Sequence, residues 1–222
     1  MITVHHLNNS RSQRVLWLLE ELGATYTVKR YERDKKTMLA PAALKAVHPL
    51  GKSPVISDAN EVVAESGAIM EYLLETYAKG ALQPAPGTAE YRQYRYWMHY
   101  AEGSLMPPLL LKLVFDKVAS SPMPFFVKPI ARKIAEMANK AFISNQIKTH
   151  LGFVEAELGK KAWFCGDHFT AADIQMSFPL EAAAARGAID EQYPNIAAFL
   201  QRIHTRDAYQ RALKTGGEYA YA

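Results

Sequence analysis

Apolar and polar positions in the first third of the chain change from the two-residue period of a strand to the period of a helix. Ile2 and Val4 alternate with polar neighbours, which predicts a first strand. The next apolar positions recur at helical spacing and are Val15, Leu18, Leu19 and Leu22. Gly23 follows them, and a glycine after the last periodic residue is a common helix end. This segment therefore predicts a strand followed by a helix.

Residues 24–80 contain further short strand and helix patterns. Thr27 and Val28 are β-branched and favour a strand over 26–31. The elements predicted after it are a short helix over 35–46, a turn at 48–51, strands over 52–56 and 62–64, and a helix that begins at Glu65 and Ser66. The order is βαβα followed by a ββα unit, so residues 1–80 are predicted to form an α/β domain.

The rest of the chain reads as helical. Residues 81–88 are rich in proline and glycine and are predicted to link residues 1–80 to an all-α domain over 89–222. The helices expected there are an aromatic one over 90–103, a long one over 129–158 that is broken or bent near Gly152, one that starts at Thr170, and a final one over 196–213. Thr170 and Asp173 have the spacing of a capping box.

Composition excludes several classes of function. The chain has 222 residues and a formal net charge of +4, but acidic residues accompany the basic ones along its length, so a nucleic-acid partner is not expected. The most continuous apolar region, 105–115, is too short to span a bilayer. We therefore expect a soluble, cytoplasmic protein with no membrane partner.

Cysteine and histidine usage limits the chemistry further. Cys165 is the only cysteine, so the chain has no intrachain disulfide and no redox dithiol. Any thiol chemistry must come from a ligand. His5 and His6 are adjacent in a predicted strand and point to opposite faces, so we expect no metal site there.

Two dipeptides predict a site for a small acidic peptide. Pro54 opens a strand and cannot donate a ladder hydrogen bond, which places Ser53 and Pro54 at an edge or a cis turn with free backbone groups nearby. Glu65 and Ser66 stand where a helix begins. Free N–H groups and the positive end of the helix dipole favour a bound carboxylate there.

These dipeptides, with residues 8–22 upstream and 166–174 downstream, resemble the glutathione S-transferase superfamily. Residues 8–22 are similar to the first loop and helix of bacterial and fungal transferases, and 166–174 to the capping box of the second domain. The resemblance implies a thioredoxin-like N-terminal domain, an all-α C-terminal domain and glutathione as co-substrate. It covers nearly the whole chain, and order and spacing together make it specific.

The resemblance also implies roles for single residues. Those expected to bind glutathione are Lys52, Ser53, Pro54, Glu65, Ser66 and Glu102. Glu102 is expected to approach the γ-glutamyl amine from a partner subunit, since the family resemblance implies a homodimer. The hydrophobic substrate is expected between the domains, against Tyr96, Tyr100, Met106 and Leu110.

Activation of glutathione means stabilising its thiolate. Lowering the thiol pKa by about two units needs roughly 2.7 kcal/mol, which one or two charge-assisted hydrogen bonds can supply. Ser10 is the first candidate donor because serine-type relatives place a hydroxyl there. Alignment on Arg14 and Val15 puts Asn9 at the position that other classes use. Ser12 is a third candidate that also suits a helix cap, and the sequence leaves the choice open.

Three functions follow from these patterns. The first is a homodimeric detoxification enzyme that conjugates glutathione to hydrophobic electrophiles, with glutathione-dependent peroxide reduction as a close variant. The second is a non-catalytic interaction module of the same fold, and the third is a carrier of hydrophobic ligands. The sequence contains no phosphate-binding loop, dinucleotide fingerprint or His-Glu-x-x-His motif, so no cofactor beyond glutathione and no metal is expected.

Overall fold

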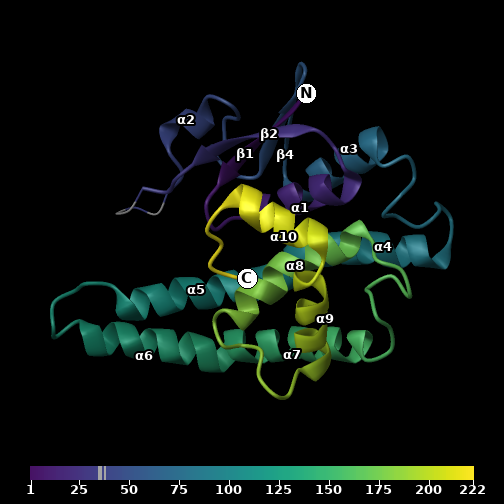
Figure 1. Ribbon diagram of the computed structural model, residues 1–222. Coiled ribbons are helices and arrows are strands. Elements are labelled where there is room, and N and C mark those ends of the chain that lie inside the picture. Colours follow the sequence, from purple (N-terminus) through teal and green to yellow (C-terminus); the bar gives the residue numbers. More distant parts are fainter. Residues whose placement is uncertain (35–36, 38) are drawn as a thin grey trace.

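The computed structural model describes residues 1–34, 37 and 39–222 and begins with a four-stranded sheet (Figure 1). Its strands are β1 (Ile2–Leu7), β2 (Tyr26–Tyr31), β3 (Val55–Asp58) and β4 (Glu61–Ala64). They lie in the order β2-β1-β3-β4, with β1 parallel to β2 and antiparallel to β3, and β3 antiparallel to β4. The mixed sheet confirms the predicted α/β class of the N-terminal region.

Helices α1 (Ser12–Leu22) and α3 (Ser66–Tyr77) belong to the same α/β unit. Each contributes apolar side chains to the core, and in α1 every residue from Ser12 to Leu19 is buried. The helix predicted over 35–46 is shorter than expected, because α2 covers only Ala42–Lys45. Pro41 precedes it in an extended conformation and restricts the residue before it, so the helix begins after the proline. Residues 35, 36 and 38 of that prediction lie outside the described residues.

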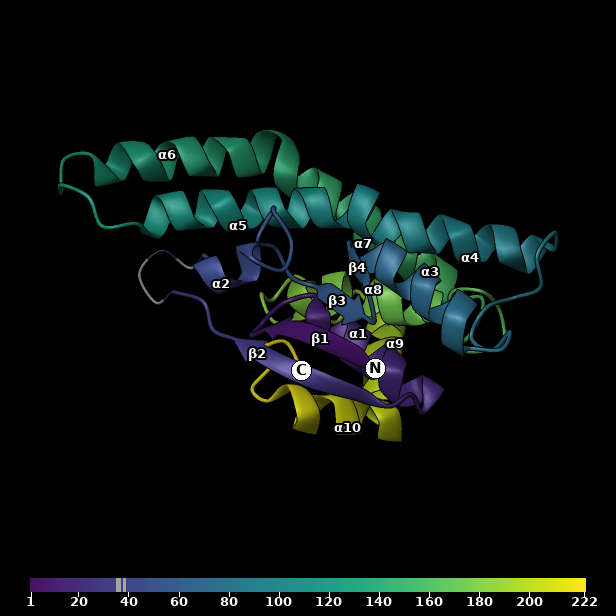
Figure 2. The ribbon, with the colours of Figure 1, turned by 90° about the horizontal axis from the view of Figure 1, so that it is seen from above.

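The remaining chain is helical. Its first part forms two long rods that lie side by side in both ribbon views (Figures 1 and 2). One rod consists of α4 (Ala89–Tyr100), the π-helical turn η1 (Ala101–Leu105) and α5 (Met106–Ser120). The other consists of α6 (Lys128–Ala138), the π-helical turn η2 (Asn139–Ile143) and α7 (Ser144–Leu158). Helices α8 (Ala171–Ala184), α9 (Pro194–His204) and α10 (Asp207–Gly216) complete the fold.

Two helix predictions are wrong in detail. The long helix predicted over 129–158 does not break at Gly152, which lies inside α7; its irregularity is the π-helical turn η2. An exposed glycine costs a helix only about 1 kcal/mol, so it weakens the helix without ending it. The final helix predicted over 196–213 is two helices, because Arg206 is extended between α9 and α10.

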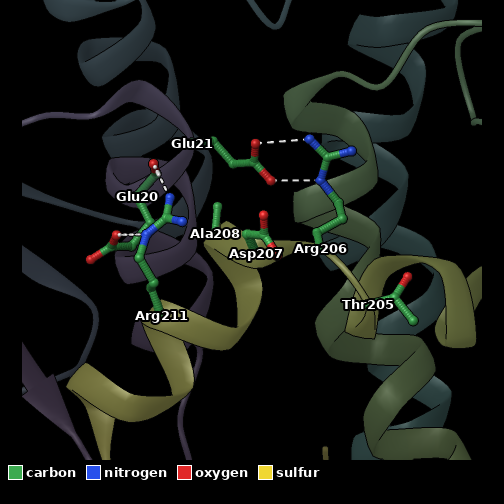
Figure 3. Close-up of a pocket in the computed structure, with 7 residues that line it drawn as sticks. All are labelled: Glu20, Glu21, Thr205, Arg206, Asp207, Ala208 and Arg211. Atoms are coloured by element: carbon green, nitrogen blue, oxygen red, sulfur yellow. Dashed lines mark hydrogen bonds and ion pairs between the residues drawn. The ribbon is translucent and has the colours of Figure 1, made fainter.

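Helix α10 returns to the first unit and packs along α1. Arg206 donates to Glu21 through Nε and Nη2, at 2.6 and 2.8 Å, and Arg211 donates to Glu20 at 2.8 Å (Figure 3). These pairs line a surface hollow between the helices. Because both arginines there are already paired with carboxylates, we interpret the hollow as a junction between the two regions.

Helix α8 is buried almost throughout and begins at the predicted capping box. The Asp173 carboxylate accepts from the backbone N–H groups of Thr170, at 2.8 Å, and Phe164, at 2.9 Å. Burial raises the pKa of Asp173 to about 6, although these hydrogen bonds oppose the shift. Cys165 beside this motif is 7% exposed, and burial raises the pKa of its thiol to about 12.

In the described ranges, no helix combines the length and apolar character needed to cross a membrane.

Candidate functional site

The loop between β1 and α1 gathers serine hydroxyls around the end of the first strand. Ser10 Oγ lies 2.8 Å from Ser12 Oγ and 3.4 Å from Ser53 Oγ. Ser12 Oγ lies 2.9 Å from His6 Nδ1, and its backbone N–H donates to Ser10 Oγ at 3.2 Å. Ser53 Oγ donates to the backbone carbonyl of His5 at 3.1 Å. The structure therefore brings Ser10 and Ser53 together and adds His6, which the sequence did not indicate.

His6 lies at the inner end of this network. Burial, with a smaller effect of Arg30, lowers the pKa of His6 to about 4, so the ring is neutral at pH 7. Ser12 Oγ is within hydrogen-bond distance of His6 Nδ1, of Ser10 Oγ and, at 3.3 Å, of the Leu7 carbonyl. The Ser10 hydroxyl is therefore engaged in a buried network.

Asn9 precedes this network and has a different environment. Its φ of 49° lies in the left-handed region, which asparagine adopts more readily than most residues. Its Oδ1 accepts a hydrogen bond of 2.8 Å from the backbone N–H of Ala220. No described residue accepts from the Asn9 side-chain nitrogen. Both of its N–H donors are therefore available to a ligand.

A second group of predicted residues surrounds the N-terminus of α3. Glu65, Ser66 and Glu102 line one pocket together with residues of α3, α4, η1 and α8. Glu65 has a φ of 74°, a costly conformation for a residue with a side chain. The first N–H groups of α3 have no partner within the helix, as at every helix start. The pocket thus combines free N–H groups with three carboxylates, those of Glu65, Glu71 and Glu102.

Arg14 organises this pocket and was missed as a site residue. It is 1% exposed and donates to the Ser66 hydroxyl at 3.0 Å, to the Glu102 carboxylate at 2.5 Å and to the backbone carbonyl of Gln175 at 2.5 Å. Arg11 also donates to Glu102, at 2.9 Å. One sequence signal could have identified Arg14: it lies four positions before Leu18 and so falls on the buried side of an amphipathic helix.

Charge explains how the Arg14 cluster is held. Burial lowers the pKa of Arg14, and the ion pair with Glu102 opposes that shift. Burial alone would raise the pKa of Glu102, but Arg14 and Arg11 outweigh it and lower the pKa below its usual value. Glu102 is therefore ionised at neutral pH and already paired within its own chain.

The other predicted glutathione-binding residues lie near the same sheet edge. Pro54 is buried and joined to Ser53 by a cis peptide bond, immediately before β3. Lys52 is exposed, and no hydrogen bond or ion pair connects it to another described residue. Its ammonium group is free for a ligand.

The residues predicted for the hydrophobic substrate are not gathered into one cavity. Tyr96 and Tyr100 are stacked and line a hollow formed by α4 and η1, which contains none of the predicted glutathione-binding residues. Met106 is 7% exposed, whereas Leu110 is 51% exposed on α5. Tyr100 also forms a hydrogen bond of 2.6 Å with His150. Within the described residues, no group of three potential ligands is placed to hold a metal ion.

Comparison with known proteins identifies the fold. The family profile of the glutathione S-transferase N-terminal domain matches residues 1–75, and that of the C-terminal domain matches residues 137–202. "Glutathione S-transferase 1" of Saccharomyces cerevisiae is 37% identical over 94% of this chain and 92% of its own. The chain belongs to the glutathione S-transferase family.

Other members of the family agree with this assignment. "Glutathione S-transferase 3" of Schizosaccharomyces pombe is 36% identical over 94% of this chain and 85% of its own. A crystal structure of a glutathione S-transferase from Actinobacillus pleuropneumoniae has a TM-score of 0.83 and 35% identity, over 99% of this chain and 94% of that one. These relatives confirm the predicted superfamily, the fold class and the enzyme class.

Proposed function

We propose that this glutathione S-transferase binds glutathione beside β3 and the N-terminus of α3, stabilises its thiolate and joins it to a hydrophobic electrophile. The pocket that combines Glu65, Ser66 and Glu102 carries the proposal. A glutathione transferase of Phanerochaete chrysosporium, 25% identical with a TM-score of 0.73, has been solved in complex with oxidized glutathione. That relative supports glutathione as the co-substrate.

Each end of glutathione has matching groups in this arrangement. The γ-glutamyl carboxylate receives hydrogen bonds from Ser66 and the first N–H groups of α3. Glu65 holds the adjacent amino group. Free backbone groups at Ser53 and Pro54 pair with the cysteinyl backbone, and Lys52 meets the glycyl carboxylate.

We propose that Glu102 acts within its own subunit, whereas the family resemblance implies an approach from the partner subunit. Its carboxylate is paired with Arg11 and Arg14 of the same chain, which favours a role in holding Arg14 against Ser66. The γ-glutamyl site is then supported by a carboxylate from its own subunit.

Asn9 is the proposed thiolate donor. Ser10 is 4% exposed and its hydroxyl is hydrogen-bonded to Ser12 at 2.8 Å, so donation to sulfur would compete with an internal hydrogen bond. Asn9 has two unused N–H donors in the same loop. A donor to a thiolate lowers the thiol pKa because it stabilises only the ionised form.

The remaining features of the proposal follow the family. We expect conjugation of hydrophobic electrophiles between the two domains, in a cytoplasmic homodimer whose domains are linked by residues 81–88. Peroxide reduction by the bound thiolate uses the same activated sulfur. Detoxification is the biological role that such a reaction serves.

The ultraviolet thiolate absorbance of bound glutathione, recorded across pH, tests this proposal without a second substrate. Wild-type protein is expected to lower the thiol pKa by about one to two units from its reference value near 8.5. Asn9→Gly removes the donor without strain in the left-handed region and should raise the bound pKa by about one unit or more. Ser10→Ala should change the pKa by less than half a unit.

Calorimetry in the same samples separates binding from activation. Glutathione binding without a thiolate signal in the wild type would favour the carrier or the interaction module over the enzyme. A larger effect of Ser10→Ala than of Asn9→Gly would assign activation to the serine hydroxyl instead.

A further inference from the structure

The C-terminus lies against the loop that precedes α1, although 211 positions separate the two contacting residues (Figure 1). The backbone N–H of Ala220 donates to Asn9 Oδ1 at 2.8 Å. A primary amide is planar and carries its oxygen and its NH2 group on opposite sides. Fixing the oxygen toward Ala220 therefore turns the nitrogen away from the C-terminus.

The segment that supplies this N–H is firmly anchored. Tyr219 is 8% exposed, and its hydroxyl donates to Glu181 Oε2 at 2.7 Å. Glu181 lies on α8, is 1% exposed and also accepts from the Tyr209 hydroxyl at 2.7 Å. Chain ends are usually loosely held unless side chains tie them down, and here buried hydroxyls do so.

Local geometry brings the segment back over the first domain. Gly217 ends α10 with a φ of 85°, a conformation that favours glycine, and reverses the chain there. Tyr221 then packs edge-on against Phe178 of α8, with ring centroids 5.6 Å apart. Residues 217–221, here called the C-terminal strap, are thus held at both the turn and the tip.

We propose that the C-terminal strap positions Asn9 for thiolate stabilisation. This inference rests on the proposed role of Asn9 as the donor. Without the Ala220 N–H, the amide can rotate and present its oxygen, whose partial negative charge disfavours a thiolate. The strap removes that alternative. The C-terminal helical domain therefore helps to activate a sulfur that is bound mainly by the N-terminal domain.

The Ser10 network explains why this positioning matters. The Ser10 and Ser12 hydroxyls are hydrogen-bonded to one another, so neither serine of the loop is a free donor. Asn9 itself lacks an internal hydrogen bond that would hold its nitrogen in place, since only its oxygen has a partner among the described residues.

The substitution Ala220→Pro tests the inference because proline has no backbone N–H. We expect the pKa of bound glutathione to rise by about one unit and kcat at pH 6.5 to fall about tenfold. The KM for glutathione should change less than about twofold. The rate should recover near pH 9, where the thiol ionises without help.

Ala222→Pro is the matched control. It places the same residue two positions later and removes only the 3.4 Å bond from Ala222 N–H to the Tyr219 carbonyl. Its thiolate pKa and rate should match those of the wild type. Equal effects of both prolines, or a loss in Ala220→Pro that persists at pH 9, would mean that the strap acts only through stability and would overturn the proposal.

Tyr219→Phe gives a second route should Ala220→Pro fold poorly. It removes the hydroxyl that anchors the strap to Glu181 and leaves the Ala220 N–H in place, so the bound thiol pKa should rise by a smaller amount. A pKa unchanged in both strap variants would overturn the strap proposal alone. Absence of bound thiolate in the wild type would instead overturn the proposed function, and the strap proposal with it.

Discussion

At the scale of single residues, Arg14 shows how a buried charge serves the site. Its guanidinium joins α1 to α3, η1 and α8 through Ser66, Glu102 and the Gln175 carbonyl. Burying a charged group costs free energy unless the group is paired with opposite charges and hydrogen-bonded. The cluster therefore fixes how these helices are positioned more than it adds to the net stability of the fold. The Ser66 hydroxyl is consequently held where the proposed carboxylate would bind.

Arg14→Lys tests this role, because an ammonium group has neither the reach nor the planar geometry to satisfy all three acceptors. We expect a loss of about 2–4 kcal/mol in the free energy of unfolding, together with weaker glutathione binding. Urea unfolding and calorimetry measure the two effects. Arg11→Lys is the control: Arg11 has a half-exposed side chain that pairs with Glu102 alone, so we expect a loss below about 1 kcal/mol. Equal losses would show that Arg14 has no special role.

At the scale of elements, α8 is the central helix of the second region. Its thirteen residues from Ala171 to Ala183 are all buried, so its first turn has no water to satisfy its N–H groups. The Asp173 carboxylate accepts from Thr170 and from Phe164. The capping box therefore fixes both the start of α8 and the loop that enters it.

The raised pKa of Asp173 predicts a pH dependence of stability. Its folded-state value of about 6 exceeds the unfolded value near 3.9, so the folded protein binds the proton more tightly. The contribution of Asp173 to the free energy of unfolding is full below pH 4 and falls by about 3 kcal/mol as the pH rises through 6.

Asp173→Asn isolates this effect because an amide does not ionise. Urea unfolding of both proteins from pH 4 to 7 should show the variant gaining about 3 kcal/mol relative to the wild type. Any constant cost of the amide shifts the whole profile without changing its slope. If the free energy of unfolding of wild type and variant changes in parallel with pH, the hydrogen bonds to Asp173 cancel the effect of burial on its pKa.

At the scale of the whole molecule, the hairpin of α5 and α6 extends beyond the rest of the fold (Figure 2). On α6, Ile130, Ile134 and Met137 recur at helical spacing and are 60%, 53% and 60% exposed. Ala131 and Ala135 face the other way and are buried. An exposed apolar stripe of this kind is typical of an interface.

We expect this stripe to contribute to the proposed homodimer. Light scattering should give twice the chain mass of 24.9 kDa for the wild type and a single chain mass for Ile130→Glu combined with Ile134→Glu. Lys128→Glu combined with Arg132→Glu also places two carboxylates on exposed positions of α6, on the side of the helix away from the stripe, and should leave the dimer intact. A wild-type protein with the mass of one chain would contradict the prediction.

The order of the elements in residues 1–80 and the family follow from the sequence alone, whereas helix α5 was not predicted. Local signals were sufficient where one face of an element is buried: the strand over 26–31 was predicted with its observed bounds, and the capping box at Thr170 and Asp173 is present. Lys52, Ser53, Pro54, Glu65 and Ser66 could be proposed as site residues from the sequence because their chemistry depends on neighbours in the chain. Errors arose where tertiary packing overrides propensity, as at Gly152, which α7 includes in a continuous helix.

Which distant groups meet depends on tertiary packing. Periodicity places a residue on a face but does not reveal what packs against that face. Arg14 reaches Glu102, and Ala220 contacts Asn9, only after both domains have folded together. The direction of a hydroxyl or amide depends on every partner around it, and those partners come from remote segments of the chain.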